Sequence, residues 1–188
     1  MDIVIESFLS FKNEYFDQYR IGKSYYPHGA IYGNQHCQNP YLKTEADIQV
    51  KYGGFLEHWL TEQYPNLIVH AELPVYNLPH ARSDLSIHFV NDNDYWSNQQ
   101  QIRDSLKIVI EIKYANVHHP LFDFKQGGIE KDIKLLQSLP EDVKKYLLLI
   151  DEAELINSNN DIVKNILKDA KTSNILVVSN NISLMNTS

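Results

Sequence analysis

Three charged residues stand in segments that otherwise have the character of buried β-strands. Leu106 to Ala115 reads LKIVIEIKYA, with Glu111 and Lys113 inside a run of Ile and Val, and ARSDLSIHFV upstream carries Asp84. Carboxylates are the ligands that hard divalent cations prefer, and an ammonium group beside them suits an anionic substrate. Burying such charges without compensation is costly. These residues therefore indicate either a metal site that acts on an anion or a network of buried ion pairs.

Strand geometry gathers these charges on one face. Alternate residues of a strand share a face, so Glu111 and Lys113 point the same way. Each strand is expected to present an apolar face on its other side: Ile108, Ile110 and Ile112 in one, and Leu85, Ile87 and Phe89 in the other, where Asp84, Ser86 and His88 form the polar face. The alternation predicts a polar face built from two strands. A short ExK alone would equally suit an exposed edge strand with ordinary charges.

An antiparallel hairpin would bring the carboxylates together. If Asp84 lies opposite Glu111, the residue numbers of each pair sum to 195, and Phe89 faces Leu106. The polar run from Val90 to Ser105 then becomes a connecting loop, and its unusual length hints at a functional role. The two carboxylates would sit side by side at the open end of this hairpin.

A third carboxylate comes from a predicted helix in TEADIQVKYGGFLEHWLTEQYP, which Pro65 ends. At about 100° per residue, Glu45 falls roughly 40° from the centre of the apolar stripe. That stripe comprises Ile48, Tyr52, Phe55, Leu56 and Trp59. Glu45 is therefore expected to face the sheet. Its place near the helix N-terminus is also explained by the helix dipole alone.

The remaining elements complete an α/β pattern. Helical spacing predicts helices over 3–19, 124–139 and 161–170, with Ile129, Ile133 and Leu136 inward in the second, and strands are expected over 67–76, 84–90, 106–114, 146–150 and 174–178. This order predicts a three-layer α/β sandwich with a central mixed sheet flanked by helices. We expect one domain over 1–188, with an N-terminal helix and loop extension over 1–43, a catalytic core over 44–150 and a C-terminal helix and strand over 151–188.

Composition excludes several classes of protein. Hydrophobic residues make up 43% and charged residues 22% of the 188 residues, as in an ordinary globular protein. A net charge of −7 argues against non-specific coating of nucleic acid, which needs many Lys and Arg contacts to phosphate, but allows a local basic groove. A single cysteine, Cys37, excludes sites built from several thiolates. No apolar run could span a bilayer and Met1 to Ser10 lacks a signal-peptide pattern, so we expect a cytoplasmic protein outside membranes.

Five segments of the chain resemble the PD-(D/E)XK nuclease superfamily: TEADIQVKYGGFL, RSDLSIHF and IEIKYA, followed by IEKDIKLLQSL and KYLLLI. They are most similar to the nuclease domains at the start of restriction-enzyme motor subunits. The resemblance covers Thr44 to about Ile150 and implies a restriction-endonuclease-like core. Ser83 stands where the family has its name-giving proline, and these 188 residues include no helicase segment.

The resemblance also implies a chemistry. Asp84 and Glu111, with Glu45 through water and the backbone carbonyl of Ile112, would hold one or two Mg²⁺ or Mn²⁺ ions that activate a water. Lys113 would orient that water or stabilise charge on the phosphate. The expected activity is a metal-dependent deoxyribonuclease in restriction, defence or DNA processing. The alternative is a catalytically idle nuclease-like domain that binds DNA or a protein partner. Because duplex cutters with one site per chain commonly pair, a homodimer is a further expectation.

Other residues are candidates for contacts with the nucleic acid. Four lie in the helix predicted over 124–139, and two lie in the long loop: Lys125, Gln126, Lys131 and Lys134, then Trp96 and Arg103. A solvated helix face would equally explain the first group, and Trp96 could simply pin the loop to the body. Glu72 is a candidate additional ligand, and one histidine of the pair His118-His119 is a candidate substrate contact.

A nucleotide hydrolase is the less favoured reading. IGKS at 21–24 and LLLIDEAE at 147–154 resemble the two P-loop motifs. Asp17 occupies the place of the required first glycine, and the motif follows a predicted helix rather than a strand.

Overall fold

The structure, a computed structural model, describes residues 2–14, 45–91, 96, 98–115, 128–151 and 161–179. Its centre is a five-stranded sheet whose spatial order follows the sequence. The strands are β1 Leu67–Leu73, β2 Ser83–Phe89, β3 Leu106–Ala115, β4 Lys144–Asp151 and β5 Ile175–Ser179. The pairs β1–β2 and β2–β3 are antiparallel, while β3–β4 and β4–β5 are parallel, so the predicted mixed sheet of an α/β protein is confirmed.

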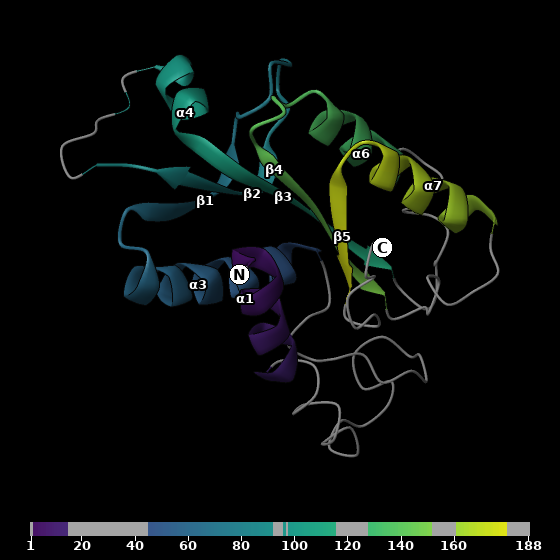
Figure 1. The fold of residues 1–188 in the computed structure, drawn as a ribbon, viewed down its shortest axis with the longest axis horizontal. Coiled ribbons are helices and arrows are strands. Elements are labelled where there is room, and N and C mark those ends of the chain that lie inside the picture. Colours follow the sequence, from purple (N-terminus) through teal and green to yellow (C-terminus); the bar gives the residue numbers. More distant parts are fainter. Residues whose placement is uncertain are drawn as a thin grey trace.

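Helices cover both faces of the sheet and form three layers (Figure 1). Helices α1 (Ile3–Lys12) and α3 (Glu45–Gln63) lie on one face, and α6 (Ile129–Gln137) and α7 (Asp161–Thr172) lie on the other. The predicted inward residues Ile129, Ile133 and Leu136 are buried between α6 and the sheet. None of the helices in the described ranges is long and apolar enough to cross a membrane.

Strand β3 divides its side chains between the two cores as the alternation predicts. Ile108, Ile110 and Ile112 join the core under α1 and α3, and Val109 joins the core under α6 and α7. A strand buried on both faces is typical of a parallel sheet, and β4 alternates in the same way. Because the apolar side chains of β3 are buried in this alternating way, each polar residue of the strand has a fixed face of the sheet toward which it points.

Helix α3 approaches β2 closely through a glycine. A Cβ atom on Gly53 would lie 3.1 Å from Cδ2 of Leu85, whereas one on Gly54 would meet nothing within 4 Å. Gly53 is therefore explained by the close packing of α3 on the sheet, despite its poor helix propensity. Helix α1 packs beside α3, where the Tyr52 hydroxyl lies 2.9 Å from that of Ser7.

The structure corrects the prediction of an entirely irregular connection between β2 and β3. Residues Gln99–Ser105 form helix α4, whose N-cap Asn98 accepts a 3.1 Å hydrogen bond from the N–H of Gln101. Asparagine is a strong N-cap residue, and Gln and Arg are good helix formers, so this turn stabilises itself locally. The helix was missed because its polar sequence has no apolar stripe.

Two further boundaries differ from the prediction. Strand β1 ends at Leu73 rather than at residue 76, because Glu72 has a φ of 56° and the N–H of Val75 turns back to the carbonyl of Leu73. Of the helices predicted over 3–19 and 124–139, the described parts are α1, which ends at Lys12, and α6, which begins at Ile129. Residues 15–19 and 124–127 lie outside the described ranges, as does most of the loop expected in the N-terminal extension over 1–43.

Candidate active site

The β2–β3 hairpin has the predicted register where the carboxylates lie. Leu85 pairs with Ile110, Ser86 with Val109 and Ile87 with Ile108, and each pair sums to 195. Carried one step further, this register sets Asp84 opposite Glu111. Beyond Ile87 the register shifts, and His88 rather than Phe89 pairs with Leu106. The predicted Phe89–Leu106 pair is therefore wrong, because a β-bulge inserts one extra residue, Lys107, into β3.

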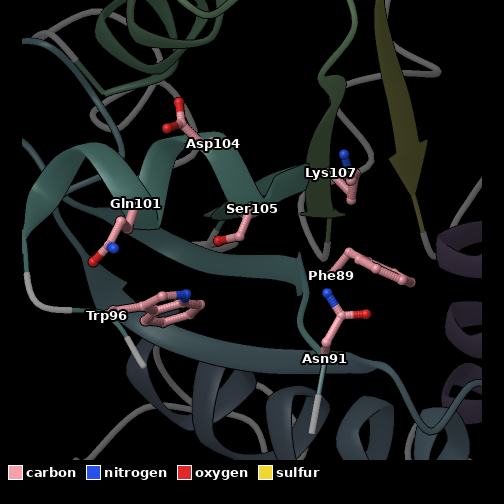
Figure 2. A pocket seen from close by; sticks show the side chains of 7 residues that line it. All are labelled: Phe89, Asn91, Trp96, Gln101, Asp104, Ser105 and Lys107. Atoms are coloured by element: carbon pink, nitrogen blue, oxygen red, sulfur yellow. The ribbon is translucent and has the colours of Figure 1, made fainter. Parts of the chain in front are cut away.

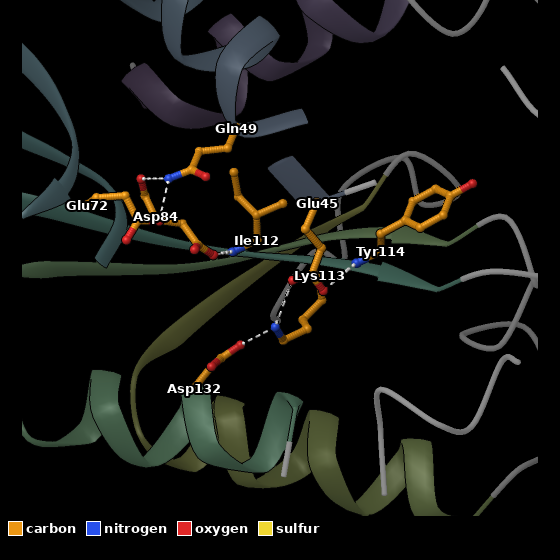
Figure 3. Close-up of polar contacts among 8 residues, drawn as sticks. All are labelled: Glu45, Gln49, Glu72, Asp84, Ile112, Lys113, Tyr114 and Asp132. Carbon is orange, nitrogen blue, oxygen red and sulfur yellow. Dashed lines mark hydrogen bonds and ion pairs between the residues drawn. The ribbon is translucent and has the colours of Figure 1, made fainter. Parts of the chain in front are cut away.

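The side chain of Asp84, at the start of β2, links this strand to its neighbour β3. Its Oδ2 accepts a 2.6 Å hydrogen bond from the N–H of Ile112 (Figure 3). Its backbone carbonyl accepts a 2.8 Å bond from Nε2 of Gln49, which also donates to Glu72 at 3.0 Å. Helix α3 thus holds the start of β2, and the carboxylate of Asp84 is directed at β3.

Lys113 lies between two carboxylates from different helices. Its Nζ is 3.2 Å from Oε2 of Glu45 and 3.1 Å from Oδ2 of Asp132, as Figure 3 shows. The other oxygen of Glu45 accepts a 3.3 Å bond from the N–H of Tyr114. The prediction that Glu45 faces the sheet is confirmed. The Glu45 carboxylate is joined to both the side chain and the backbone of β3.

Asp132 is a member of this cluster that the sequence reading missed. It is 6% exposed and lies on the buried face of α6, next to Ile133. The available signal was its spacing, because Asp132 stands three residues after Ile129 and so shares the inward face of that helix. An acidic residue on an otherwise apolar helix face needs a partner, and here Lys113 supplies it.

Glu111 is the most deeply buried carboxylate of the cluster, at 3% exposure. The hydroxyl of Tyr76, itself buried, donates a hydrogen bond to Oε1 of Glu111. Tyr76 follows β1, and nothing in its sequence context separates it from ordinary core tyrosines. Its role could be read only from the tertiary contact.

The cluster holds more carboxylates than positive charges, and burial and mutual repulsion raise the pKa values of three of these carboxylates. Burial raises the pKa of Glu111 well above its ordinary value, and Asp84 and Asp132 raise it further. Burial also raises the pKa of Asp84, against the opposing hydrogen bond from Ile112. It raises the pKa of Asp132 to about 6 even beside Lys113. One ammonium group therefore does not neutralise four neighbouring carboxylates.

Lys113 stays charged in this setting. Burial disfavours its ammonium form, but Asp132 and Glu45 together outweigh that effect and raise the pKa above the ordinary lysine value. A lysine held in this way is an electrostatic group rather than a general base, because it does not release its proton near neutral pH.

The donors fit a hard divalent cation by their chemistry. Asp84, Glu111 and Glu45 offer carboxylate oxygens. Burial, the main cause of the raised pKa values of Asp84 and Glu111, disfavours their charged forms, and a bound cation would offset that cost. However, no three His, Cys, Asp or Glu side chains within the described ranges are already arranged around one metal position. In the structure the charged groups pair with one another and with Tyr76, which is the buried network that the sequence also allowed.

The other predicted residues lie elsewhere or outside the described ranges. Lys131 and Lys134 are exposed on α6, and Glu72 is exposed at the end of β1. Arg103 lies on α4, where its Nη2 donates to Gln99 at 3.3 Å. Trp96 packs on the rings of His70 and His88, with centroid distances of 5.0 and 4.9 Å, so it contacts the body of the sheet. The remaining candidates lie in undescribed segments: His118, His119, Lys125, Gln126 and the segment 21–24.

Comparison of the chain with protein-family models, with curated proteins and with solved structures finds no match.

Proposed function

We propose that this protein is a metal-dependent nuclease that hydrolyses phosphodiester bonds of DNA, with a restriction-endonuclease-like core of the PD-(D/E)XK type. One observation carries the proposal. Asp84 at the start of β2, Glu111 and Lys113 on β3 and Glu45 on α3 come from three elements and converge in one buried cluster. Maintaining four such groups together against their desolvation cost is expected of a site with a chemical task.

The residues divide into two roles. Asp84 and Glu111, with the carbonyl of Ile112 and with Glu45 through water, would hold Mg²⁺ or Mn²⁺. When bound, such an ion lowers the pKa of a water and neutralises a phosphate oxygen. Lys113 supplies a fixed positive charge toward the scissile phosphate, where negative charge grows during attack. Glu45 and Asp132 hold that ammonium group at 3.2 and 3.1 Å and keep it protonated.

The experiment is cleavage of a panel of nucleic acids: duplex, single-stranded and branched DNA, and RNA. Each is incubated with Mg²⁺ or Mn²⁺ and with EDTA. We expect metal-dependent cutting of at least one DNA form, and loss of about 10²- to 10³-fold in rate for Lys113→Ala, the range for removing one transition-state contact. Lys168→Ala, which removes an exposed lysine on α7, is the matched control and should cut normally.

A second variant separates chemistry from folding. Lys113→Ala leaves the buried carboxylate of Asp132 and the partly exposed carboxylate of Glu45 without their cation, and an unpaired buried charge destabilises a protein. Asp84→Asn keeps an oxygen that can accept the 2.6 Å bond from Ile112 and removes only the charge. Undiminished cutting by a folded Asp84→Asn variant would rule out the assigned site.

A nuclease-like domain that only binds DNA or a protein is the second candidate. It is favoured by the self-paired state of the cluster, in which Lys113 already has two carboxylate partners and Glu111 accepts from Tyr76. This candidate expects no cutting of any nucleic-acid form under any metal, together with retained binding of a partner. Cleavage that Asp84→Asn abolishes would exclude it.

A further inference from the structure

A pocket of about 280 Å³ lies at the opposite end of β2 from the carboxylate cluster. Its lining includes Phe89, Trp96, Gln101, Asp104, Ser105 and Lys107 (Figure 2). Trp96 and Gln101 lie at one end, and Phe89 and Lys107 lie at the other. None of the residues assigned to the active site lines it. The volume is slightly below the range of about 300–1,000 Å³ common for drug-sized ligands, so it suits a smaller group.

A buried hydrogen-bonded histidine fixes the tryptophan wall of this pocket. Trp96 rests on the rings of His70 and His88. His88 is fully buried, and its ring nitrogens lie 3.0 Å from the hydroxyl of Ser105 and 2.9 Å from that of Ser86. Ser105 also lines the pocket, so α4, β2 and Trp96 are tied together at this point. The indole is thus held in place rather than lying loosely on the surface.

The opposite wall combines an exposed aromatic ring with a lysine. Phe89 is 41% exposed, so part of its ring is accessible to a ligand in the pocket. Lys107 is the residue that the β3 register skips between Leu106 and Ile108. A β-bulge turns its extra side chain away from the regular alternation, and here that side chain reaches the pocket.

This set of side chains matches one nucleotide unit. Aromatic rings stack on any base, an ammonium group pairs with the adjacent phosphate, and the Asp104 carboxylate accepts from an exocyclic amino group. Stacking also gives affinity without many phosphate contacts, which suits a chain with a net charge of −7.

We propose that the Phe89–Trp96 pocket binds an unpaired base of the strand that this protein cuts; this rests on the nuclease function proposed above. Asp84 and Phe89 are five residues apart on β2, or roughly 16 Å at about 3.3 Å per residue. That distance corresponds to about five stacked nucleotides. The substrate is therefore a nucleic acid with a single-stranded segment several nucleotides from the scissile bond.

The first test measures binding without cutting. The anisotropy of a labelled single-stranded DNA of about 15 nucleotides is followed as protein is added in EDTA. Phe89→Ala should weaken binding by about 5- to 150-fold, the range for losing one stacked base. Val50→Ala removes an exposed apolar side chain from α3, 71% exposed, and should bind normally. Equal affinity for Phe89→Ala and the unchanged protein would overturn the pocket.

The second test asks whether a base is what the pocket holds. The variant Trp59→Phe leaves Trp96 as the sole tryptophan of the chain, so its emission reports on the pocket. Single-stranded DNA should quench this emission, and an abasic strand of the same length and charge should not. Equal quenching by both strands would show that backbone charge alone is sensed, which contradicts the proposal.

Failure of the pocket and failure of the nuclease function are distinguishable. If the protein cuts duplex DNA in a metal-dependent way but neither binds nor cuts single-stranded or branched forms, the pocket proposal is wrong and the nuclease stands. If single strands bind through Phe89 but no form is cut, the pocket stands as a binding site and the nuclease assignment is overturned.

Discussion

The backbone N–H of Ile112 donates a 2.6 Å hydrogen bond to Oδ2 of Asp84. Strand β2 begins only at Ser83, so the carboxylate satisfies a backbone donor of β3 just where the ladder runs out. The bond holds Asp84 toward β3 beside the two charged residues that flank Ile112. One side chain therefore both ends the β2–β3 ladder and forms part of the proposed active site.

Asp132 is expected to position Lys113 rather than to react. Asp132→Asn should lower the cleavage rate by about 10- to 100-fold, as is typical for groups that orient a functional side chain. The loss should fall on kcat, with KM nearly unchanged, because Asp132 is buried and would not touch substrate. Asp132→Glu should recover part of the rate. Glu130→Gln changes an exposed acid in the same helix turn and serves as the control; an equal loss there would point to a general effect on α6.

Binding of Mg²⁺ should stabilise the folded chain. A ligand present at about 100 times its Kd adds about 2.7 kcal/mol of stability if it binds only the native state. Thermal unfolding with and without Mg²⁺ measures this, and Glu111→Gln should abolish the shift. A shift that persists in Glu111→Gln would place the ion elsewhere.

The stabilisation by Mg²⁺ should shrink as the pH falls. Burial raises the pKa of Glu111 and Asp84 and brings that of Asp132 to about 6, so protons compete with the cation. A carboxylate whose pKa is higher in the folded state than in the unfolded state contributes stability to the metal-free protein. This contribution is complete at a pH below the pKa of the unfolded state, and it is lost as the pH rises through the pKa of the folded state. Acidification should therefore favour the metal-free form and weaken its response to Mg²⁺. A response that grows on acidification would contradict the assigned carboxylates.

His88 should destabilise the protein in acid. Burial, together with the smaller effect of nearby His70, lowers the pKa of His88 from the ordinary value of 6.5 to about 4. A depressed histidine pKa gives stability that is present above the unfolded value and lost as pH falls toward the folded one. The loss amounts to about 3 kcal/mol at 1.36 kcal/mol per pKa unit.

Urea unfolding across this pH range, in EDTA, checks the His88 prediction against matched variants. His88→Gln should lack this acid-linked loss, although it is less stable at neutral pH. His58→Gln, at a histidine whose side chain is 80% exposed, should retain it. The same loss in all three proteins would assign it to other groups.

The paired glycines of α3 should respond differently to alanine. Gly54→Ala should stabilise the protein by about 0.5–1 kcal/mol through helix propensity, since nothing lies within 4 Å of the new methyl group. Gly53→Ala should gain nothing, because its methyl group would lie 3.1 Å from Leu85, which is packed in the core. Urea unfolding of both variants measures the difference. Equal gains would show that Leu85 yields without cost.

Features that depend on local periodicity can be predicted from the order of the amino acids. Alternation in β2 and β3 predicts which side chains enter each core as far as Ile87, whereas Phe89, which it also assigns to the apolar face, is 41% exposed. The register with Asp84 opposite Glu111 is a hypothesis that the pairs from Leu85 to Ile87 follow. The angle of Glu45 from the apolar stripe of α3 likewise predicts its contact with the sheet. These features are readable because one face of each element must be buried, and burial leaves a periodic signature.

The contacts by which distant elements complete the cluster and the pocket become visible only in the folded chain. Asp132 reaches Lys113 because α6 crosses the sheet at that point, and Tyr76 reaches Glu111 because the chain turns after β1. The bulge at Lys107 shifts the register by one residue and directs that side chain into the pocket. Such contacts depend on crossing angles, turn geometry and bulges that leave no period in the sequence. The cluster was therefore predictable for the hairpin residues and for Glu45, whose angle on its own helix is readable, and not for Asp132 and Tyr76.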